Sequence, residues 1–232
     1  MAALSKPQTQ LLVALSESNP AATAAPAPPA GESKPAPARR TAKDLPPGAG
    51  ALAAAAQRAF AERRLDEAEQ KFTEILRQDE KNVYVLGNLA TVEIEKNKVE
   101  EAEKYLATAL GVDGQDDYCL YQMGRVKAMR GKPDEALNYL SQSAKINPDR
   151  PETQDYLGIV LVEKGLRTQA EAAFRKALQI QPDFGSAHHN LAFVYATTKP
   201  PLPALARWHY QKSLDAGLPR SADIEKLIED KP

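Results

Sequence analysis

The sequence predicts an all-α fold, an α-solenoid of about five helical hairpins followed by a short capping helix. Its composition favours helices, because alanine is abundant while tryptophan and phenylalanine together number only six, which suits closely packed helices better than β-sandwiches. Apolar residues recur at helical spacing in stretches of about 12 to 14 residues. These stretches repeat with a period of 34 residues, and such a period is typical of arrays that stack one helical unit on the next.

The period is set by small and large residues at fixed places in each unit. One alanine recurs every 34 residues, as Ala68, Ala102, Ala136 and Ala170. A bulky apolar residue lies four positions later, as Phe72, Leu106, Leu140 and Phe174. A small residue lies twelve positions earlier, as Ala56, Ala90, Gly124 and Gly158. We expect the small residue of a first helix to let the second helix approach closely, with the bulky residue filling the remaining space.

Each pair of helical stretches is separated by a short turn. Asn97, Gly131 and Gly165 occupy equivalent places in three of these turns, and all three tolerate the left-handed conformation that ends many helices. Pro133 then suits the first position of the following helix, where its missing N–H costs nothing. Two helices joined in this way cannot bury their apolar faces alone, so each hairpin must stack on its neighbours.

This arrangement resembles the tetratricopeptide repeat family over residues 49–215. The copy that matches the family best carries its small, alanine, aromatic, alanine and proline positions as Gly158, Ala170, Phe174, Ala177 and Pro182. The first copy departs from the pattern, since its first helix lacks an early large apolar residue and Glu80 stands in place of the closing proline. The resemblance implies a right-handed superhelix whose first helices line an inner groove.

The predicted organisation places a tail or linker over residues 1–48 and a repeat domain over 49–230. The hairpins are expected at about 49–82, 83–116, 117–150, 151–184 and 185–220. The fifth copy fits only with two extra residues in its turn, so we expect an enlarged, stiff turn at residues 199–203. A capping helix is expected over 221–230, with Ser221 as its N-cap and an apolar stripe of Ile224, Leu227 and Ile228.

The tail is rich in alanine and proline between residues 20 and 50, and such a composition predicts disorder. Residues Leu11 to Leu15 form an apolar run, which we interpret as a frayed remnant or, alternatively, as a docking helix. The run is too short for a signal peptide, and no segment is apolar enough to span a membrane. The default expectation is therefore a cytoplasmic protein, with a periplasmic or extracellular location open if the chain is a fragment.

Charge and motifs argue against several function classes. The 30 Lys and Arg nearly cancel the 31 Asp and Glu, so nothing indicates a nucleic-acid or anionic-membrane partner. Phosphate-binding loops, nucleophile elbows and metalloprotease or calcium motifs are absent from the sequence. The single Cys119 follows Asp116 and Asp117, whose charges should raise the pKa of its thiol and discourage a thiolate. We expect no enzyme, no cofactor and no small-molecule substrate.

The histidines raise the question of a metal site. His188 and His189 are adjacent in the fifth copy, so they lie about 100° apart around one helix and cannot easily share an ion. Zinc needs three or four ligands, and only His209 on the paired helix could approach. We therefore expect structural roles, with His188 packed against the preceding hairpin and His189 facing the inner groove, and no metal.

The resemblance also implies which side chains line the groove. Carried over residue by residue, they are Tyr84, Asn88, Thr91, Glu95, Tyr118, Tyr121, Gln122, Arg125, Met129, Glu152, Asp155, Tyr156, Ile159, Glu163, Ser186, His189, Asn190 and Phe193. Tyrosines among amide and charged neighbours suit an extended peptide or a helix, although the same tyrosines could simply pad the interfaces between repeats. Repeats that grip a chaperone carboxylate need basic partners, whereas Glu152 and Tyr156 stand at those places.

These observations predict a non-catalytic scaffold or adaptor that binds a peptide or protein segment in its groove. One alternative is a module of a larger bacterial protein, tethered by the proline-rich linker, since the "LARWHYQKSLDAG" ending looks like repeat arrays of that kind. Another is a structural solenoid that associates with itself end to end.

Overall fold

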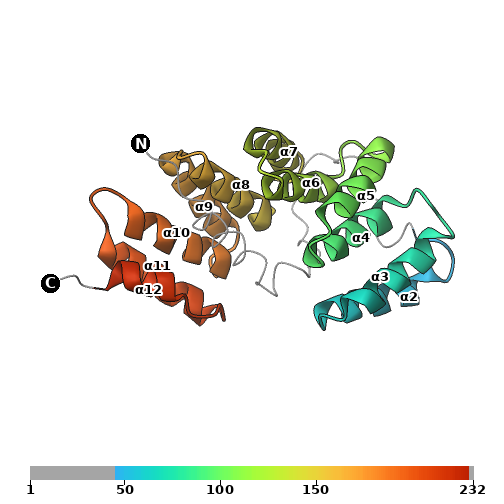
Figure 1. Ribbon diagram of the computed structural model, residues 1–232, viewed down its shortest axis with the longest axis horizontal. Helices are drawn as coiled ribbons and strands as arrows, with labels where there is room; N and C mark the ends of the chain where they lie inside the picture. Colours follow the sequence, from blue (N-terminus) through green and yellow to red (C-terminus); the bar gives the residue numbers. More distant parts are fainter. Residues whose placement is uncertain (1–44, 230–232) are drawn as a thin grey trace. The chain divides into compact units, whose positions relative to one another are not determined.

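The structure is a computed structural model that describes residues 45–229, and the regular structure within that range is helical (Figure 1). The predicted tail lies outside the described residues as far as position 44. Eleven helices are present in the described range: α2 (Ala49–Ala61), α3 (Leu65–Leu76), α4 (Val83–Glu95), α5 (Val99–Val112), α6 (Asp117–Met129), α7 (Pro133–Ile146), α8 (Pro151–Glu163), α9 (Arg167–Ile180), α10 (Gly185–Thr197), α11 (Pro203–Asp215) and α12 (Ala222–Ile228).

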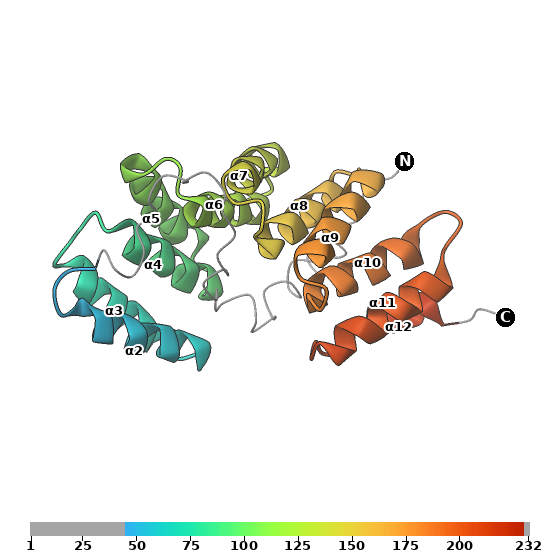
Figure 2. The same ribbon diagram turned by 180° about the vertical axis from the view of Figure 1, so that it is seen from behind.

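The helices form the five predicted hairpins, within two compact units. The boundary between the units falls between Pro148 and Asp149. In the first unit α2 packs on α3, α4 on α5 and α6 on α7, and the hairpins adjoin through α3 with α4 and α5 with α6. In the second unit α8 packs on α9 and α10 on α11, while α10 also contacts α9 (Figure 2). None of the described helices is long and apolar enough to cross a membrane.

The turns inside the first four hairpins share one geometry. Asn97, Gly131 and Gly165 have positive φ angles of 58°, 69° and 76°, as predicted, and Arg63 takes the same conformation in the first hairpin. One residue later, the backbone N–H donates to the carbonyl five residues before it in the chain, for example from Leu166 to Leu161 at 2.8 Å. This is the Schellman arrangement, which satisfies carbonyls that the helix end would leave unpaired.

The fifth hairpin turns differently. Between α10 and α11 the chain makes the enlarged, proline-containing turn that the sequence predicts, and the backbone N–H of Leu202 donates to the Tyr195 carbonyl at 3.0 Å. The packing residues of this copy take the usual places, since Ala206 and Ser213 are fully buried and Tyr210 is 5% exposed. The longer turn therefore leaves the register of the last hairpin intact.

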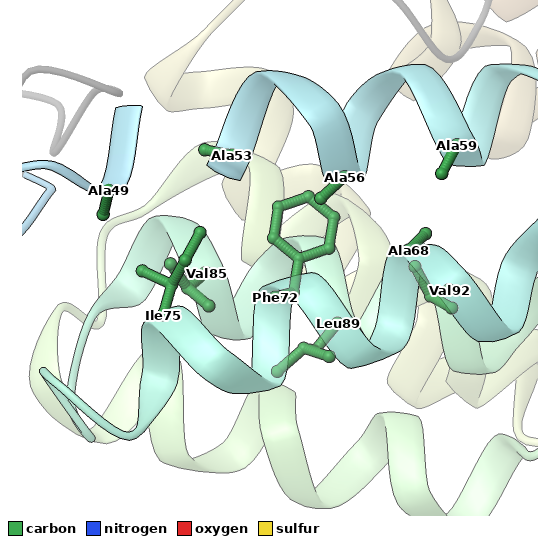
Figure 3. Close-up of a cluster of buried hydrophobic side chains, with 10 residues drawn as sticks. All are labelled: Ala49, Ala53, Ala56, Ala59, Ala68, Phe72, Ile75, Val85, Leu89 and Val92. Atoms are coloured by element: carbon green, nitrogen blue, oxygen red, sulfur yellow. The ribbon is translucent and has the colours of Figure 1, made fainter. Parts of the chain in front are cut away.

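Small residues lie where the two helices of a hairpin cross. A Cβ added at Gly158 would stand 2.6 and 2.7 Å from Cδ1 and Cζ of Phe174, and one added at Gly124 would stand 2.6 Å from Cγ of Leu140. Figure 3 shows the equivalent place in the first hairpin, where Phe72 of α3 points toward Ala56 of α2. The predicted pairing of small and bulky residues is thus confirmed.

The short helix α12 covers the last hairpin through contacts with α10 and α11. The Ser221 side chain accepts a hydrogen bond from the backbone N–H of Ile224 at 3.4 Å, and Ile224 is fully buried. The predicted N-cap is therefore confirmed. The predicted apolar stripe is wrong at Leu227, which is 42% exposed, whereas Ile224 is fully buried.

Candidate functional site

The best-organised part of the predicted surface in the first unit joins α4 and α6. Thr91 Oγ1 donates to the carbonyl of Gly87 at 2.9 Å and lies 2.6 Å from the Tyr118 hydroxyl. Gln122 Nε2 donates to the same Thr91 oxygen at 2.9 Å. Since a threonine hydroxyl has one proton and two lone pairs, the Tyr118 hydroxyl is the donor in its contact. Thr91 is then fully hydrogen-bonded and fixes two side chains of the next first helix.

Arg125 continues this network one turn further along α6. Its Nη1 donates to Gln122 Oε1 at 3.0 Å, its Nη2 lies 3.8 Å from a carboxylate oxygen of Glu95, and its guanidinium carbon is 5.9 Å from the ring centroid of Tyr121. The Tyr121 ring is in turn 6.5 Å from that of Tyr118. The guanidinium is therefore held by its own chain, and a ligand would meet a fixed group rather than a mobile one.

Tyr84 and Asn88 of α4 are engaged more locally. The Tyr84 hydroxyl accepts a hydrogen bond from Gln57 Nε2 at 2.5 Å, and burial raises its pKa. Asn88 Nδ2 donates to the carbonyl of Tyr84 in the preceding turn at 2.7 Å. The Asn88 amide is thus turned toward its own helix and does not reach α6 in this conformation.

In the second unit the predicted residues meet between α8 and α10. Asp155 accepts two hydrogen bonds, from Ser186 Oγ to Oδ2 at 2.6 Å and from Asn190 Nδ2 to Oδ1 at 2.9 Å. All three residues are at most 2% exposed. Burial raises the pKa of Asp155 to about 7, against the lowering effect of its two donors, and nearby Glu152 raises it further.

In the second unit, three apolar or aromatic members of the predicted set are buried. Tyr156, Ile159 and Phe193 are each 1% exposed. Their role within the unit is therefore packing in this conformation, as the interpretation of the tyrosines as interface padding requires. Partial exposure is retained by Glu152 at the start of α8 and by Glu163 at its end.

His189 does not present a ring nitrogen to solvent. It is fully buried, its ring lies 6.3 Å from that of Tyr210, and neither ring nitrogen has a hydrogen-bond partner in the described part of the chain. Burial lowers its pKa to about 4, so the imidazole is neutral near pH 7. The expected place of His189 on an open groove therefore needs revision toward a buried position near α11.

His188 and His209 form a pair, as the sequence allowed. Their Nδ1 atoms are 2.8 Å apart, and His188 Nε2 lies 3.0 Å from the carbonyl of Pro182. A carbonyl only accepts, so Nε2 of His188 carries the proton and its Nδ1 accepts from His209. Trp208 packs its ring edge-on against both imidazoles and is 54% exposed. Among residues 45–229, no group of three or more potential ligands could hold a metal ion.

Cys119 has the environment that the sequence predicts. It is buried, and the pKa of its thiol is raised well above the ordinary value by burial and then by the charge of Asp116. Asp116 Oδ1 also accepts the backbone N–H of Cys119 at 2.8 Å and so caps α6. The residue is a small packing element whose thiol is held in its unreactive form.

The sequence identified the polar residues but missed their pairing across helices. Thr91 with Gln122 and Asp155 with Ser186 are both separated by 31 residues, and Asp155 with Asn190 by 35. A separation of 31 is three residues less than the repeat period of 34, and a separation of 35 is one residue more. Residues separated in this way lie on successive first helices, side by side. A search for polar residues separated by 31 or 35 positions could have predicted these pairs from the sequence.

Comparisons with known proteins agree with the repeat of helical hairpins. A model of the tetratricopeptide repeat family matches residues 59–121 and 127–192, together more than half of the chain. No curated protein sequence matches.

Solved structures show a similar fold at low sequence identity. PilW, described as a widely conserved type IV pilus biogenesis factor, is 18% identical with a TM-score of 0.68, over 78% of this chain and 83% of that one. PilF of Pseudomonas aeruginosa is 19% identical with a TM-score of 0.67, over 77% and 80%. YrrB, described as having an unusual peptide-binding site, is 20% identical with a TM-score of 0.52, over 72% and 84%.

Proposed function

Because the chain belongs to the tetratricopeptide repeat family, we propose that it is a non-catalytic scaffold that binds a peptide or protein segment on the inner faces of its first helices. Proteins of this family are protein-interaction scaffolds, and YrrB is described as having an unusual peptide-binding site. The chemistry of this surface indicates which kind of segment it would bind.

The observation that supports this proposal most is the network of α4 and α6. Tyr118, Tyr121 and Arg125 are of the types that dominate binding energy at interfaces. Thr91, Gln122 and Glu95 hold them in place before any ligand arrives. Side chains that are already ordered lose less entropy on binding, which increases affinity for the same contacts.

The same network suggests the kind of ligand. Arg125 Nη2 lies 3.8 Å from a carboxylate oxygen of Glu95, which is a long ion pair. A well-placed carboxylate of the ligand would compete with Glu95 for the guanidinium. Tyr118 is partly exposed and offers an apolar ring surface beside it, with Tyr121, 8% exposed, packed behind. A segment that carries an apolar or aromatic anchor next to an acidic group fits this part of the surface.

The test is a double substitution, Tyr121→Ala with Arg125→Ala, against a peptide selected by the parent protein from a displayed random library. We expect affinity to fall at least about tenfold, because aromatic and arginine anchors usually dominate such interfaces. The matched control is Lys104→Ala with Thr108→Ala, which alters exposed residues of α5. Circular dichroism and the melting temperature should show that both variants are folded.

Two results would contradict the proposal. Unchanged affinity in the folded Tyr121/Arg125 variant would exclude this surface as the binding site. Equal losses in the two variants would point to the second helices instead. Sedimentation over a concentration range separates peptide binding from self-association, because only a self-associating chain gains mass as its own concentration rises.

A further inference from the structure

The buried polar cluster of Asp155, Ser186 and Asn190 is rich in hydrogen-bond acceptors. Ser186 and Asn190 each donate one hydrogen bond to the Asp155 carboxylate. Each carboxylate oxygen can accept more than one hydrogen bond, so both retain acceptor capacity. No hydroxyl or amide proton of the cluster is directed at a second acceptor among the bonds that the structure shows.

Asn190 Oδ1 has no hydrogen-bond partner among the described residues, although Asn190 is fully buried. The bond from its own Nδ2 to Asp155 fixes the amide, so this oxygen stands next to the carboxylate. A buried acceptor without a donor costs about 1–3 kcal/mol. An unpaired oxygen and a carboxylate with spare capacity, side by side, form a site that a ligand with several donors would complete.

The electrostatics of the cluster favour a cation. Glu152 lies one turn before Asp155 on α8, and its charge acts on Asp155. Arg150, just before α8, lowers the pKa of Glu152, but burial dominates and raises it. Among the described residues, the charged group that acts on Asp155 is this second carboxyl. Two neighbouring carboxyls, the buried Asp155 and the partly exposed Glu152, are stabilised in their charged forms by an added positive charge.

We propose that the inner face of α8 and α10 binds the ammonium or guanidinium group of a lysine or arginine side chain. An ammonium has three donors and a guanidinium five, and neither accepts. Either can therefore donate to Asp155 and to Asn190 Oδ1 at once, while a backbone N–H, with a single donor and no charge, can satisfy only one of them. Glu152 is partly exposed and marks the side from which the group enters.

We assign the lysine or arginine to the bound peptide segment, and this assignment rests on the proposed function. The existence of the cation site does not depend on it. The site lies wholly within the second unit and selects a cationic residue of the ligand.

The experiment uses the full chain and small probes that mimic side chains, n-butylammonium and n-butylguanidinium, with n-butanol as the uncharged control. The Asn190 side-chain amide and the Asp155 carboxyl carbon are followed by NMR during titration. We expect saturable shifts with both cations and none with n-butanol. Bound cation should also lower the pKa of Asp155, because it stabilises the carboxylate.

Variants locate the effect. Asp155→Asn should weaken cation binding at least tenfold, and Glu152→Gln, at a partly exposed position, should weaken it severalfold without a risk to folding. Glu163→Gln, at the opposite end of α8 and also partly exposed, is the matched control and should bind like the parent.

The outcomes are distinct. Shifts that do not saturate, equal shifts with n-butanol, or equal losses in Glu152→Gln and Glu163→Gln would overturn the cation site. Saturable cation binding that depends on Glu152, in a protein that selects no peptide, would support the site and refute the proposed function. If spermidine binds at least as tightly as a selected lysine peptide, the cation comes from a free polyamine, and the assignment to a peptide side chain is overturned.

Discussion

Substituting Gly158 by alanine adds one carbon at the point where α8 and α9 cross. The new Cβ would stand 2.6 and 2.7 Å from two carbons of the Phe174 ring, with Cε1 closer still, whereas carbon atoms are at their best separation near 3.5–4.0 Å. The ring or the helix must therefore move by about 1 Å. Phe174 is fully buried, so it has little room to do so.

We expect Gly158→Ala to destabilise the protein by about 1–3 kcal/mol, the usual cost of overpacking. The first hairpin already combines an alanine with a phenylalanine at this crossing, Ala56 with Phe72, so the helices can separate and the cost should lie toward the lower end. Gly158→Arg would exceed it, because a long charged side chain cannot fit at the crossing.

The control is Gly111→Ala near the end of α5, where an added Cβ meets nothing within 4 Å. Alanine there should stabilise the helix by up to about 1 kcal/mol. The assay is urea unfolding followed by circular dichroism at constant pH. A second variant, Gly158→Ala with Phe174→Leu, should lose less than the sum of its single substitutions, since each relieves the other.

The reasoning would be refuted if Gly158→Ala matched or exceeded the parent in stability. Opposite signs for Gly158→Ala and Gly111→Ala cannot be explained by helix propensity, because propensity favours alanine at both positions. The difference in sign therefore tests the crossing contact itself.

Three further predictions concern pH, the tail and the thiol. As pH falls from about 6.5 to 4, His189 becomes protonated in the unfolded chain but stays neutral in the folded protein, where its pKa is about 4. This residue should therefore reduce the free energy of unfolding by on the order of 3 kcal/mol over that range. Asp155 has a raised pKa in the folded protein, so it acts in the opposite direction and offsets part of the loss. Urea unfolding at several pH values should show a flatter profile for His189→Leu than for the parent. Light proteolysis should remove residues 1–44 and leave a resistant helical core with the parent's melting temperature, and a lower melting temperature would show that the tail contributes to folding. Cys119 should react with a thiol reagent only at the rate of unfolding, so fast modification of the native protein would contradict its burial.

The sequence was sufficient to predict the hairpins, because their determinants are local and repeated. A left-handed residue such as Gly165 and a small residue such as Gly158 act within one hairpin, and a 34-residue period shows them several times. The resemblance likewise identified the face of each first helix that carries the polar residues.

The partners of those residues could not be predicted in the same way. Arg125 was expected as a residue that lines the groove, and its contacts with Gln122 and Glu95 were not predicted. His189 lies buried instead of facing an open groove. Periodicity gives the direction in which a side chain leaves its helix. Which neighbour the side chain reaches depends on its rotamer and on how far one hairpin is shifted along the next. The repeat period determines neither of these.

The hydrogen bonds between successive first helices also bear on how faithfully the chain folds. Arrays of similar units risk pairing a hairpin with the wrong neighbour during folding. The polar residues at the described contacts differ, with threonine meeting glutamine at one and aspartate meeting serine and asparagine at the other. A mispaired hairpin would bury donors and acceptors without partners, at about 1–3 kcal/mol for each. The side chains that we propose as a binding surface would thereby also favour the correct order of the repeats during folding.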